Sequence, residues 1–539
     1  MRIWTPVVAG LAGITAITLA LPANAGATIS YMEPVAAGVS LKVLATSGDN
    51  FGGVIWPGTP DGMGALKDKD GNLAIFVNHE FSATNAVAAG LSRANGAASA
   101  STVTALNYDT KNGVVTMARD LLSSVSWYNY ATGQSSTTPV APAGAAAKDD
   151  NGTPNHTKAL NRFCSANMVQ PGELAYRKTD KDGKVTTYGY TGAAYFTGEE
   201  GSDESRAFTM DNSGNLIQLP RLGLAAWENL IVAPNTGMST VVMANEDGSA
   251  TDSQLWMYTG TKTTEGHWTD KAGLTNGSLY VMSVDGISTD NIFRNTVGKG
   301  VAVRVNFNPI DYTLNGKAQN AAAKASGTVM ARVEDGAFDP NRPNDYYFVT
   351  TESNKDAKAT APNPATPAVT RDGGALWRLR YNDVKTPLAG ATLTMLLDGS
   401  EAPYMSKPDN LTVDTSGNVL IQEDPGSNDQ VARIFAYRIS DGKVATVAKF
   451  VDEYFKVGGA KFITKDEESS GILDVTDMLR TSATDKSSYY LLDAQVHATP
   501  AASRPDLAGN AAALASLAGV VEGGQLLLMT ISDWAAVYS

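Results

Sequence analysis

Short apolar runs separated by turn residues dominate the chain. Most runs are about four to six residues long and are bounded by Gly, Asn, Asp and Pro, whereas helical periodicity is scarce. This pattern is typical of β-strands joined by tight turns. The sequence therefore predicts an all-β protein with a few short helices.

One local pattern recurs along the chain: a turn, a β-rich run and an acidic residue at its end. The runs end at Glu80, Glu200, Asp247, Glu352, Asp424 and, more weakly, Asp493. A second strand with a bulky apolar pair follows several of them, at 253–260, 374–381 and 433–439. Irregular repeats of strand, turn and strand predict a β-propeller of about six blades. A β-sandwich with appended loops is the alternative, but it would not bring every acidic strand end to one side.

Uneven spacing between the repeats indicates loop insertions. A Ser/Thr/Pro/Ala segment near 131–157 and a Lys/Ala/Pro segment near 354–370 fit this description. We expect residues 26–539 to form a single β-propeller domain that carries both insertions, preceded by a signal peptide at 1–25.

The first 25 residues have the pattern of a cleaved export signal. Arg2 supplies a positive start, residues 7–21 are uncharged and apolar, and Ala23-Asn24-Ala25 provides a small-x-small cleavage pattern. The best later apolar stretch, 511–521, is short and is followed by Glu522, so we expect no membrane span. The mature protein is expected to be periplasmic or extracellular.

The net charge and the cysteine count limit the classes of binding partner and the ways of stabilising the fold that we expect. The formal net charge is −13, and the chain has a single cysteine, Cys164. A strongly acidic chain is a poor partner for nucleic acid or anionic lipid and a good one for cations. One cysteine excludes an intrachain disulfide, so folding rests on a hydrophobic core or on bound ions.

The acidic strand ends would meet around the axis of a propeller. Carboxylates crowded in one funnel repel each other unless cations neutralise them, and calcium is the hard cation that prefers such oxygen ligands. Further acidic residues occupy similar contexts: Glu228, Glu246, Glu334, Asp335, Asp409, Glu467 and Glu468. The alternative is that these are solvated carboxylates that close strands at turns.

Cys164 and the four histidines offer few further ligands. Cys164 is either a small buried apolar residue or a ligand of a transition metal. His79 directly precedes Glu80, and His156, His267 and His497 are scattered. No zinc-type spacing, P-loop, GxSxG or strand-linked GxGxxG is present, which weighs against zinc, nucleotide and serine-hydrolase chemistry.

Several short motifs, taken in order, resemble those of the PhoX-type alkaline phosphatases. The matching segments are Val77-Asn78-His79-Glu80, Cys164, Thr197-Gly198-Glu199-Glu200, Arg332-Val333-Glu334, Pro408-Asp409-Asn410-Leu411, Asp414 to Gly417, and Ile421-Gln422-Glu423-Asp424. The chain departs from the family pattern at Gly198, Val333, Asn410 and the segment 165–167. Each motif alone is short, and their consistent order carries the resemblance.

The resemblance implies a β-propeller whose axial funnel holds iron and calcium and hydrolyses phosphate monoesters of small molecules. Cys164 would hold Fe3+ as a thiolate, and Glu80, Glu200 and Glu334 would be further ligands of the Fe3+ and Ca2+ ions. The resulting metal-ligand candidates are Glu80, Cys164, Glu199, Glu200, Glu228, Glu246, Asp247, Glu334, Asp409 and Asp424. The catalytic candidates are Arg332 and Lys407, whose charges suit phosphate, and His79.

Two other functions remain open at this point. A propeller that keeps calcium only for stability would be a non-catalytic binding protein, and a phytase-like or phosphodiester-cleaving enzyme would use the same carboxylates on another substrate. The export signal has only Arg2 rather than a twin arginine. The chain would therefore be exported unfolded and would acquire its metals outside, where calcium is plentiful.

Overall fold

The computed structural model describes residues 29–83, 101–352, 362–363, 366–370, 373–427, 430–517 and 519–539. The predicted signal peptide and much of the predicted insertion near 354–370 lie outside these residues. The described part of the second insertion forms two short strands, β24 (Pro362–Asn363) and β25 (Thr366–Thr370).

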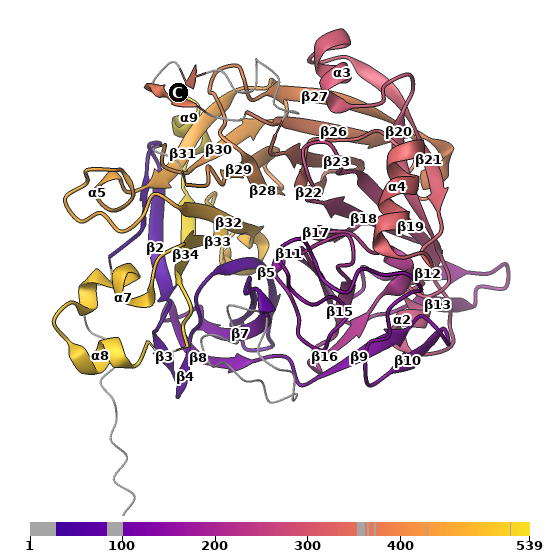
Figure 1. Cartoon of the computed structure of the whole chain (residues 1–539), viewed down its shortest axis with the longest axis horizontal. Coiled ribbons are helices and arrows are strands. Elements are labelled where there is room, and N and C mark those ends of the chain that lie inside the picture. Colours follow the sequence, from indigo (N-terminus) through magenta and orange to yellow (C-terminus); the bar gives the residue numbers. More distant parts are fainter. Residues whose placement is uncertain are drawn as a thin grey trace, which may run out of the picture.

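Six blades of mainly antiparallel strands surround one axis, and only β16 and β9 of blade 2 pair in parallel among the named strands that the structure describes (Figure 1). Blades 1, 2 and 3 begin with inner strands β5 (Pro60–Lys67), β11 (Phe163–Val169) and β17 (Trp227–Val232). Blades 4, 5 and 6 begin with β22 (Val333–Asp339), β28 (Pro408–Val413) and β32 (Glu467–Asp474). Each inner strand contacts the inner strands of both neighbouring blades, and β32 contacts β5, so the ring is closed. The predicted β-propeller is confirmed.

The remaining strands of blades 1 to 3 follow outward from the axis. Blade 1 continues with β6 (Leu73–His79), β7 (Thr102–Asp109) and β8 (Val114–Asp120). Blade 2 continues with β14 (Ala194–Glu199), β15 (Ala207–Met210), β16 (Asn215–Gln218), β9 (Ser124–Asn129) and β10 (Gln134–Ser136). Blade 3 continues with β18 (Ser239–Glu246), β19 (Leu255–Thr261), β20 (Ser278–Val284) and β21 (Ala302–Ile310).

Blades 4 to 6 have the same arrangement. Blade 4 continues with β23 (Arg342–Thr350), β26 (Ala375–Tyr381) and β27 (Ala391–Asp398), and the pairing of β27 with β21 joins it to blade 3. Blade 5 continues with β29 (Asn418–Glu423), β30 (Arg433–Arg438) and β31 (Val444–Phe450). Blade 6 continues with β33 (Ser488–Val496) and β34 (Gly523–Ile531).

Strands from the start of the described chain complete the last two blades. β1 (Met32–Pro34) pairs with β31, and β2 (Val39–Thr46) pairs with β34. Both outer edges are thus covered by segments more than 400 residues away in sequence. Pairing of this kind ties the two ends of the ring together and removes two exposed strand edges.

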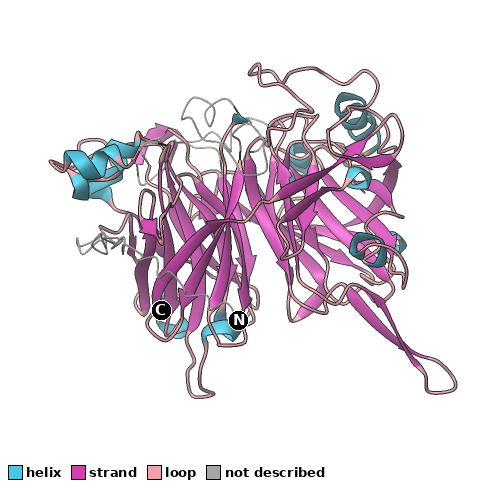
Figure 2. Ribbon diagram, turned by 90° about the horizontal axis from the view of Figure 1, so that it is seen from below, coloured by secondary structure: helices cyan, strands magenta, loops and turns pink. Residues whose placement is uncertain are grey.

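Helices and small hairpins lie outside the blades (Figure 2). The helices are α2 (Trp268–Lys271), α3 (Asp290–Thr296), α4 (Gly316–Ser326), α5 (Asp452–Phe455), α6 (Thr476–Leu479), α7 (Pro500–Ser503), α8 (Ala511–Ala515) and α9 (Trp534–Val537). The hairpins are β3 (Asn50–Phe51) with β4 (Val54–Ile55) and β12 (Ala175–Thr179) with β13 (Val185–Gly189). Within the described ranges, no helix is long and apolar enough to cross a membrane.

The hydrophobic core is divided into six clusters, one at each blade interface. Val241 and Met243 of β18 pack against blade 4, whereas Val242 and Ala244 pack against blade 2. Successive side chains of a strand point to opposite faces, and both faces of a blade are covered here. Continuous apolar runs rather than strict alternation are therefore the expected sequence pattern, as observed.

One predicted strand end is wrong. The sixth repeat was expected to stop at Asp493, but β33 continues to Val496, and Asp493 lies fully buried within it. The residue that follows the strand is His497. In blade 6, therefore, the strand end carries an imidazole rather than a carboxylate.

Candidate metal centre

Six structurally equivalent positions converge at one end of the axis. The second residue of each inner strand is acidic in five blades and a cysteine in the sixth: Asp61, Cys164, Glu228, Glu334, Asp409 and Glu468. All six are buried. Because the inner strands contact one another around the ring, these side chains meet although they are far apart in sequence. We call this set the inner ring.

A second set of residues borders the inner ring. The first residue of each inner strand pairs with His79, Glu199, Glu246, Thr350, Glu423 or Val496 of the second strand. The next residues along the chain, at the funnel side, are Glu80, Glu200, Asp247, Thr351, Asp424 and His497. Four of the six are acidic, and all four are strand ends that the repeat identified in the sequence.

Three overlapping groups of ligand atoms lie close enough to share cations. Within each group, all ligand atoms are within 4.8 Å of one another. The groups are Asp61, Glu80 and Cys164; Cys164, Glu200 and Glu228; and Glu228, Glu334 and Asp409. Cys164 and Glu228 each belong to two groups, so they occupy bridging positions.

Burial and mutual repulsion perturb these carboxyl groups. Burial, with the charges of Glu80 and Glu468, raises the pKa of Asp61 well above its usual value. Burial raises the pKa of Glu228 to about 8. Burial and the charge of Glu334 also raise the pKa of Asp409 well above the ordinary range. A cation at the ring would reverse this effect, because it favours the ionised forms.

Two arginines bring positive charge to the funnel. Arg162 Nη2 lies 2.5 Å from Glu80 Oε1 and 2.8 Å from Glu200 Oε2. Arg332 donates from Nε and Nη2 to Asp247 at 2.7 and 2.6 Å. Burial raises the pKa of Asp247, but the charge and hydrogen bonds of Arg332 outweigh this effect and hold that pKa below its usual value. These guanidinium groups offset part of the negative charge.

The residues that precede the inner strands have an unusual backbone. Thr59, Arg162, Arg332 and Lys407 directly precede the first residue of β5, β11, β22 and β28, and their φ angles are 44°, 50°, 60° and 46°. Non-glycine residues rarely occupy this left-handed region. Its recurrence at equivalent positions in four blades shows that the ring imposes it, and strain of this kind concentrates at functional sites.

Unpaired buried oxygens around the ring fit a metal site. Among the residues that the structure describes, several buried oxygens around the ring have no hydrogen-bond partner: Asp61 Oδ1, Asp409 Oδ1, Asn410 Oδ1, Gln422 Oε1, Glu467 Oε2 and Gln495 Oε1. An unpaired buried oxygen costs about 1–3 kcal/mol. When the carboxyl groups are ionised, all of these oxygens can accept hydrogen bonds and none can donate one. They are therefore suitable ligands for hard cations.

Three of the predicted site residues are not brought into this cluster. The carboxylate of Glu199 binds Arg206 at 2.6 and 2.7 Å, inside blade 2. Glu246 accepts hydrogen bonds from Trp256 Nε1 and the Gln254 backbone at 2.7 and 2.9 Å. His79 is fully buried, with its ring nitrogens 2.8 Å from Gly58 O and 2.9 Å from Thr104 Oγ1.

The other candidates do border the site. Asp247 forms an ion pair with Arg332. Asp424 lines a cavity beside the ring. Lys407 is half-buried, and its backbone carbonyl accepts a hydrogen bond from the Asp424 amide at 2.9 Å. Sequence reasoning missed Asp61 and Arg162 as site residues. Asp61 could have been found, because Pro60-Asp61-Gly62 repeats the pattern of Pro408-Asp409-Asn410.

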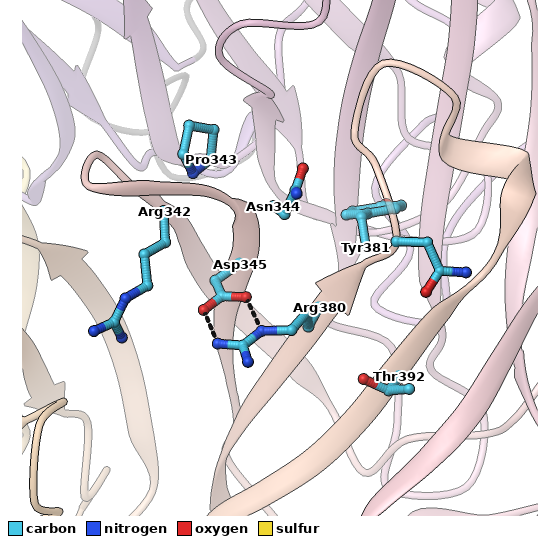
Figure 3. Close-up of a pocket in the computed structure, with 8 residues that line it drawn as sticks. Arg342, Pro343, Asn344, Asp345, Arg380, Tyr381 and Thr392 are labelled. Atoms are coloured by element: carbon cyan, nitrogen blue, oxygen red, sulfur yellow. Dashed lines mark hydrogen bonds and ion pairs between the residues drawn. The ribbon is translucent and has the colours of Figure 1, made fainter.

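Cavities adjoin the ring on both sides. A cavity of about 300 Å3 lies at the mouth and includes Glu80 and Arg162. Another, of about 420 Å3, continues along the axis below the ring and is lined by Gly62, Ser165, Asn229, Asp335, Leu411 and Gly471. A third, of about 890 Å3, lies at the far end of blade 4 around Arg342 and the Asp345–Arg380 ion pair, away from the ring (Figure 3).

The fold and site together define a six-bladed β-propeller with a carboxylate-rich, thiol-containing centre at one axial opening. The sequence model of the family described as alkaline phosphatase PhoX matches residues 210–472. The predicted resemblance to the PhoX-type family is confirmed over this part of the chain. The match supports the predicted enzyme class, an alkaline phosphatase-like phosphoric monoester hydrolase.

The fold assignment is supported by a solved structure with a TM-score above 0.5. Pseudomonas fluorescens PhoX in complex with vanadate, a transition-state analogue, superimposes with a TM-score of 0.61 at 13% identity and covers 95% of this chain and 98% of its own. The NanB sialidase of Streptococcus pneumoniae reaches a TM-score of only 0.31 at 7% identity, covering 84% of this chain and 67% of its own. No curated protein sequence matches the chain.

Proposed function

We propose that this protein is an exported, metal-dependent phosphatase that hydrolyses phosphate monoesters of small molecules at the inner ring. The observation that supports this proposal most directly is the set of three overlapping ligand groups, in each of which all ligand atoms lie within 4.8 Å of one another. Seven side chains supply them: Asp61, Glu80, Cys164, Glu200, Glu228, Glu334 and Asp409.

The donor set supports two kinds of cation. Carboxylate oxygens suit Ca2+, and the thiolate of Cys164 suits a softer transition metal such as iron. Bound cations would neutralise phosphate oxygens and act as Lewis acids at phosphorus. Cys164 would contribute only after its proton is lost, since the free thiol is buried among carboxylates.

The chain's own residues would position the substrate. Arg162 and Arg332 have guanidinium groups at the funnel, and Lys407 lies at the equivalent position of blade 5. Each guanidinium is already held by carboxylates at 2.5–2.8 Å. Because their geometry is set before substrate arrives, little ordering remains to be done when a phosphate oxygen binds.

The direct test is turnover of p-nitrophenyl phosphate by the mature protein after loading with Ca2+ and iron, combined with elemental analysis. We expect turnover that chelation abolishes and that Cys164→Ser reduces. If calcium raises the melting temperature of the metal-loaded protein but no turnover is seen, the result would instead support the alternative of a non-catalytic binding protein. Turnover of diesters alone would support the phosphodiester-cleaving alternative.

Export is supported by Arg2, the apolar stretch 7–21 and Ala23-Asn24-Ala25. Expression of the full chain in a bacterial host, followed by N-terminal sequencing of the protein recovered outside the cytoplasm, tests it. A mature N-terminus at Gly26 is expected. Protein that stays in the cytoplasm and retains residues 1–25 would contradict export.

A further inference from the structure

Glu246 is a buried carboxylate that lies outside the inner ring. Its side chain is fully buried, and among the described residues no arginine, lysine or histidine contacts its carboxylate. Two buried acids of the same region differ in this respect, because Glu199 pairs with Arg206 and Asp247 pairs with Arg332, each at 2.6 Å. A buried carboxylate without a positive partner is costly. Glu246 therefore lacks the countercharge that these two acids have.

Oxygens from separate segments surround the side-chain amide of Asn320, in α4. Its Nδ2 lies 3.1 Å from Asp203 Oδ1, 3.1 Å from Glu246 Oε1 and 3.5 Å from the backbone oxygen of Asp252. The loop after β18 folds back closely, since a Cβ added at Gly248 would lie 2.5 Å from Asp252 O and 3.6 Å from Glu246 Oε1. The helix α4 itself contacts β20 and β21 of blade 3 (Figure 1). Two carboxylates and a carbonyl thus converge on one point beside blade 3.

Two buried amide side chains at this point have atoms without partners. Asn320 is buried, and its Oδ1 has no hydrogen-bond partner among the described residues. Gln254 is fully buried, and within the same part of the chain neither its Oε1 nor its Nε2 has a partner. A buried polar atom that gives up water without a replacement is costly. These atoms therefore indicate a ligand that the protein itself does not supply.

The side chain of Gln254 lies on the same side of the sheet as Glu246. Asn245 pairs with Leu255, so Gln254 lies across from Glu246, and its backbone amide donates to Glu246 Oε2 at 2.9 Å. Side chains two residues apart in an extended chain point to the same side. Trp256, two residues after Gln254, donates from Nε1 to the same Glu246 oxygen at 2.7 Å. The unpaired amide of Gln254 is therefore on the side that Glu246 occupies.

A calcium ion would satisfy these groups. A half-turn of the Asn320 amide exchanges Oδ1 with Nδ2 while the shape of the side chain is kept, and it would turn the unpaired oxygen toward the carboxylates. Ca2+ takes about six to eight oxygens from carboxylates, backbone carbonyls, side-chain amides and water. Mg2+ fits less well, because it demands near-octahedral geometry and keeps several of its waters. The available protein oxygens are Asp203 Oδ1, Glu246 Oε1, Asp252 O, Gln254 Oε1 and Asn320 Oδ1.

We propose that a second calcium site, outside the inner ring, joins blade 2 to blade 3 and is formed by Asp203, Glu246, Asp252, Gln254 and Asn320. The site goes beyond the proposed phosphatase function and does not depend on it. Its ligands come from the turn after β14, from the end of β18 with the loop that follows, and from α4. The carboxylate of Asp252 is held by Lys324 Nζ at 3.3 Å, so Asp252 contributes its backbone oxygen.

The position of the site indicates a structural role for calcium. Asp203 follows Glu200 by three residues, and Glu246 directly precedes Asp247. Glu200 belongs to one of the ligand groups of the inner ring, and Asp247 holds Arg332. An ion that joins these two segments fixes the backbone from which both side chains reach the funnel.

The test measures calcium binding and calcium-dependent stability in Glu246→Gln. Glutamine keeps an acceptor oxygen for Trp256 and removes the charge. We expect equilibrium dialysis to show one Ca2+ ion fewer per chain. In chelator the variant should melt at the temperature of the unmodified protein or above it, because a buried charge is gone, whereas in calcium it should melt below it. This reversal distinguishes a calcium ligand from a residue that only accepts hydrogen bonds.

Asp203→Asn tests the same site from its half-buried side and carries the test if Glu246→Gln does not fold. We expect the same loss of one Ca2+ ion. Asp150→Asn is the matched control, because Asp150 is an exposed aspartate that contributes no atom to the site. Its calcium binding and its melting temperatures should equal those of the unmodified protein.

A double variant separates this site from the inner ring. Glu228→Gln removes a ring carboxylate, and we expect its loss of bound calcium to add to that of Glu246→Gln when the two are combined. Unchanged calcium binding in Glu246→Gln and Asp203→Asn, or a lower melting temperature of Glu246→Gln in chelator and calcium alike, would overturn the inference. Turnover by the unmodified protein would still support the phosphatase function in that case. Conversely, loss of one Ca2+ ion from the variants of a protein without turnover would support the site and contradict only the phosphatase function.

Discussion

Cys164 Sγ lies 3.2 Å from Asp61 Oδ2, across the contact between the inner strands of blades 1 and 2. A thiol at this distance donates a hydrogen bond to the carboxylate. The pair therefore shares a proton that a metal ion would displace, and it places a soft sulfur donor beside a hard oxygen donor.

The first prediction concerns the reactivity of this thiol. Burial, with the charges of Asp61 and Glu228, raises the pKa of Cys164 well above its usual value. In metal-free protein at pH 7 we expect iodoacetamide to modify Cys164 at least about 100-fold more slowly than in urea-unfolded protein, because only the thiolate reacts. Mass spectrometry of timed samples measures the two rates. Comparable rates would show that the thiol is ionised or exposed in the folded state.

The second prediction concerns stability and pH without metal. Burial raises the pKa of Glu228 and of Glu467 to about 8 from the ordinary value of 4.5. Between these values the folded state binds more protons than the unfolded state, so the free energy of unfolding falls as pH rises through this window. Melting in chelator at pH 5, 6.5 and 8 should show a falling melting temperature, and calcium should restore it at pH 8.

A variant isolates one contributor to that slope. Glu467→Gln keeps the shape of the side chain and removes its charge, so we expect it to stabilise metal-free protein at pH 8 by on the order of 2 kcal/mol. Glu265→Gln, on an exposed loop, serves as control and should change little. A melting temperature that rises from pH 5 to pH 8 would contradict the sign.

The third prediction concerns the bridging position of Glu228. It belongs to two ligand groups and accepts a hydrogen bond from Ser165 Oγ at 2.7 Å. Glu228→Gln preserves that contact but lowers the charge, so we expect a smaller calcium-induced rise in melting temperature and a loss of kcat/KM of about 10²-fold or more. Wild-type calcium response and turnover in this variant would exclude Glu228 as a ligand. Glu265→Gln again provides the matched acidic control.

The fourth prediction concerns Arg332. Its partner Asp247 is buried, so Arg332→Gln would leave an uncompensated charge and should destabilise metal-free protein by about 3 kcal/mol. Bound calcium should reduce this loss. Arg304→Gln is the control, since Arg304 is exposed and lies 3.9 Å from Asp285; it should cost less than about 1 kcal/mol. Urea unfolding with and without calcium measures both, and equal costs would contradict the assignment.

The strands and the acidic strand ends could be predicted because they are local. The runs that end before Glu80, Glu200 and Asp424 form β6, β14 and β29, the second strands of three blades. The inner strand β5 was harder to recognise, because its sequence PDGMGALK contains two glycines. An added Cβ at Gly62 would lie 2.2 Å from the Ala166 backbone nitrogen, so the glycine serves a contact with blade 2 that only the folded ring contains.

The sequence by itself determined the β-propeller class, through the order of apolar runs and turns, and the family motifs. Both can be recognised because they depend only on short, contiguous segments. The tertiary structure alone decided which acidic residues meet. Glu199 and Glu200 are neighbours, yet Glu199 binds Arg206 inside its blade and Glu200 joins Cys164 and Glu228 at the axis. Successive side chains of an extended chain point in opposite directions, and only the pairing of the strands and the closure of the ring establish which direction faces the funnel.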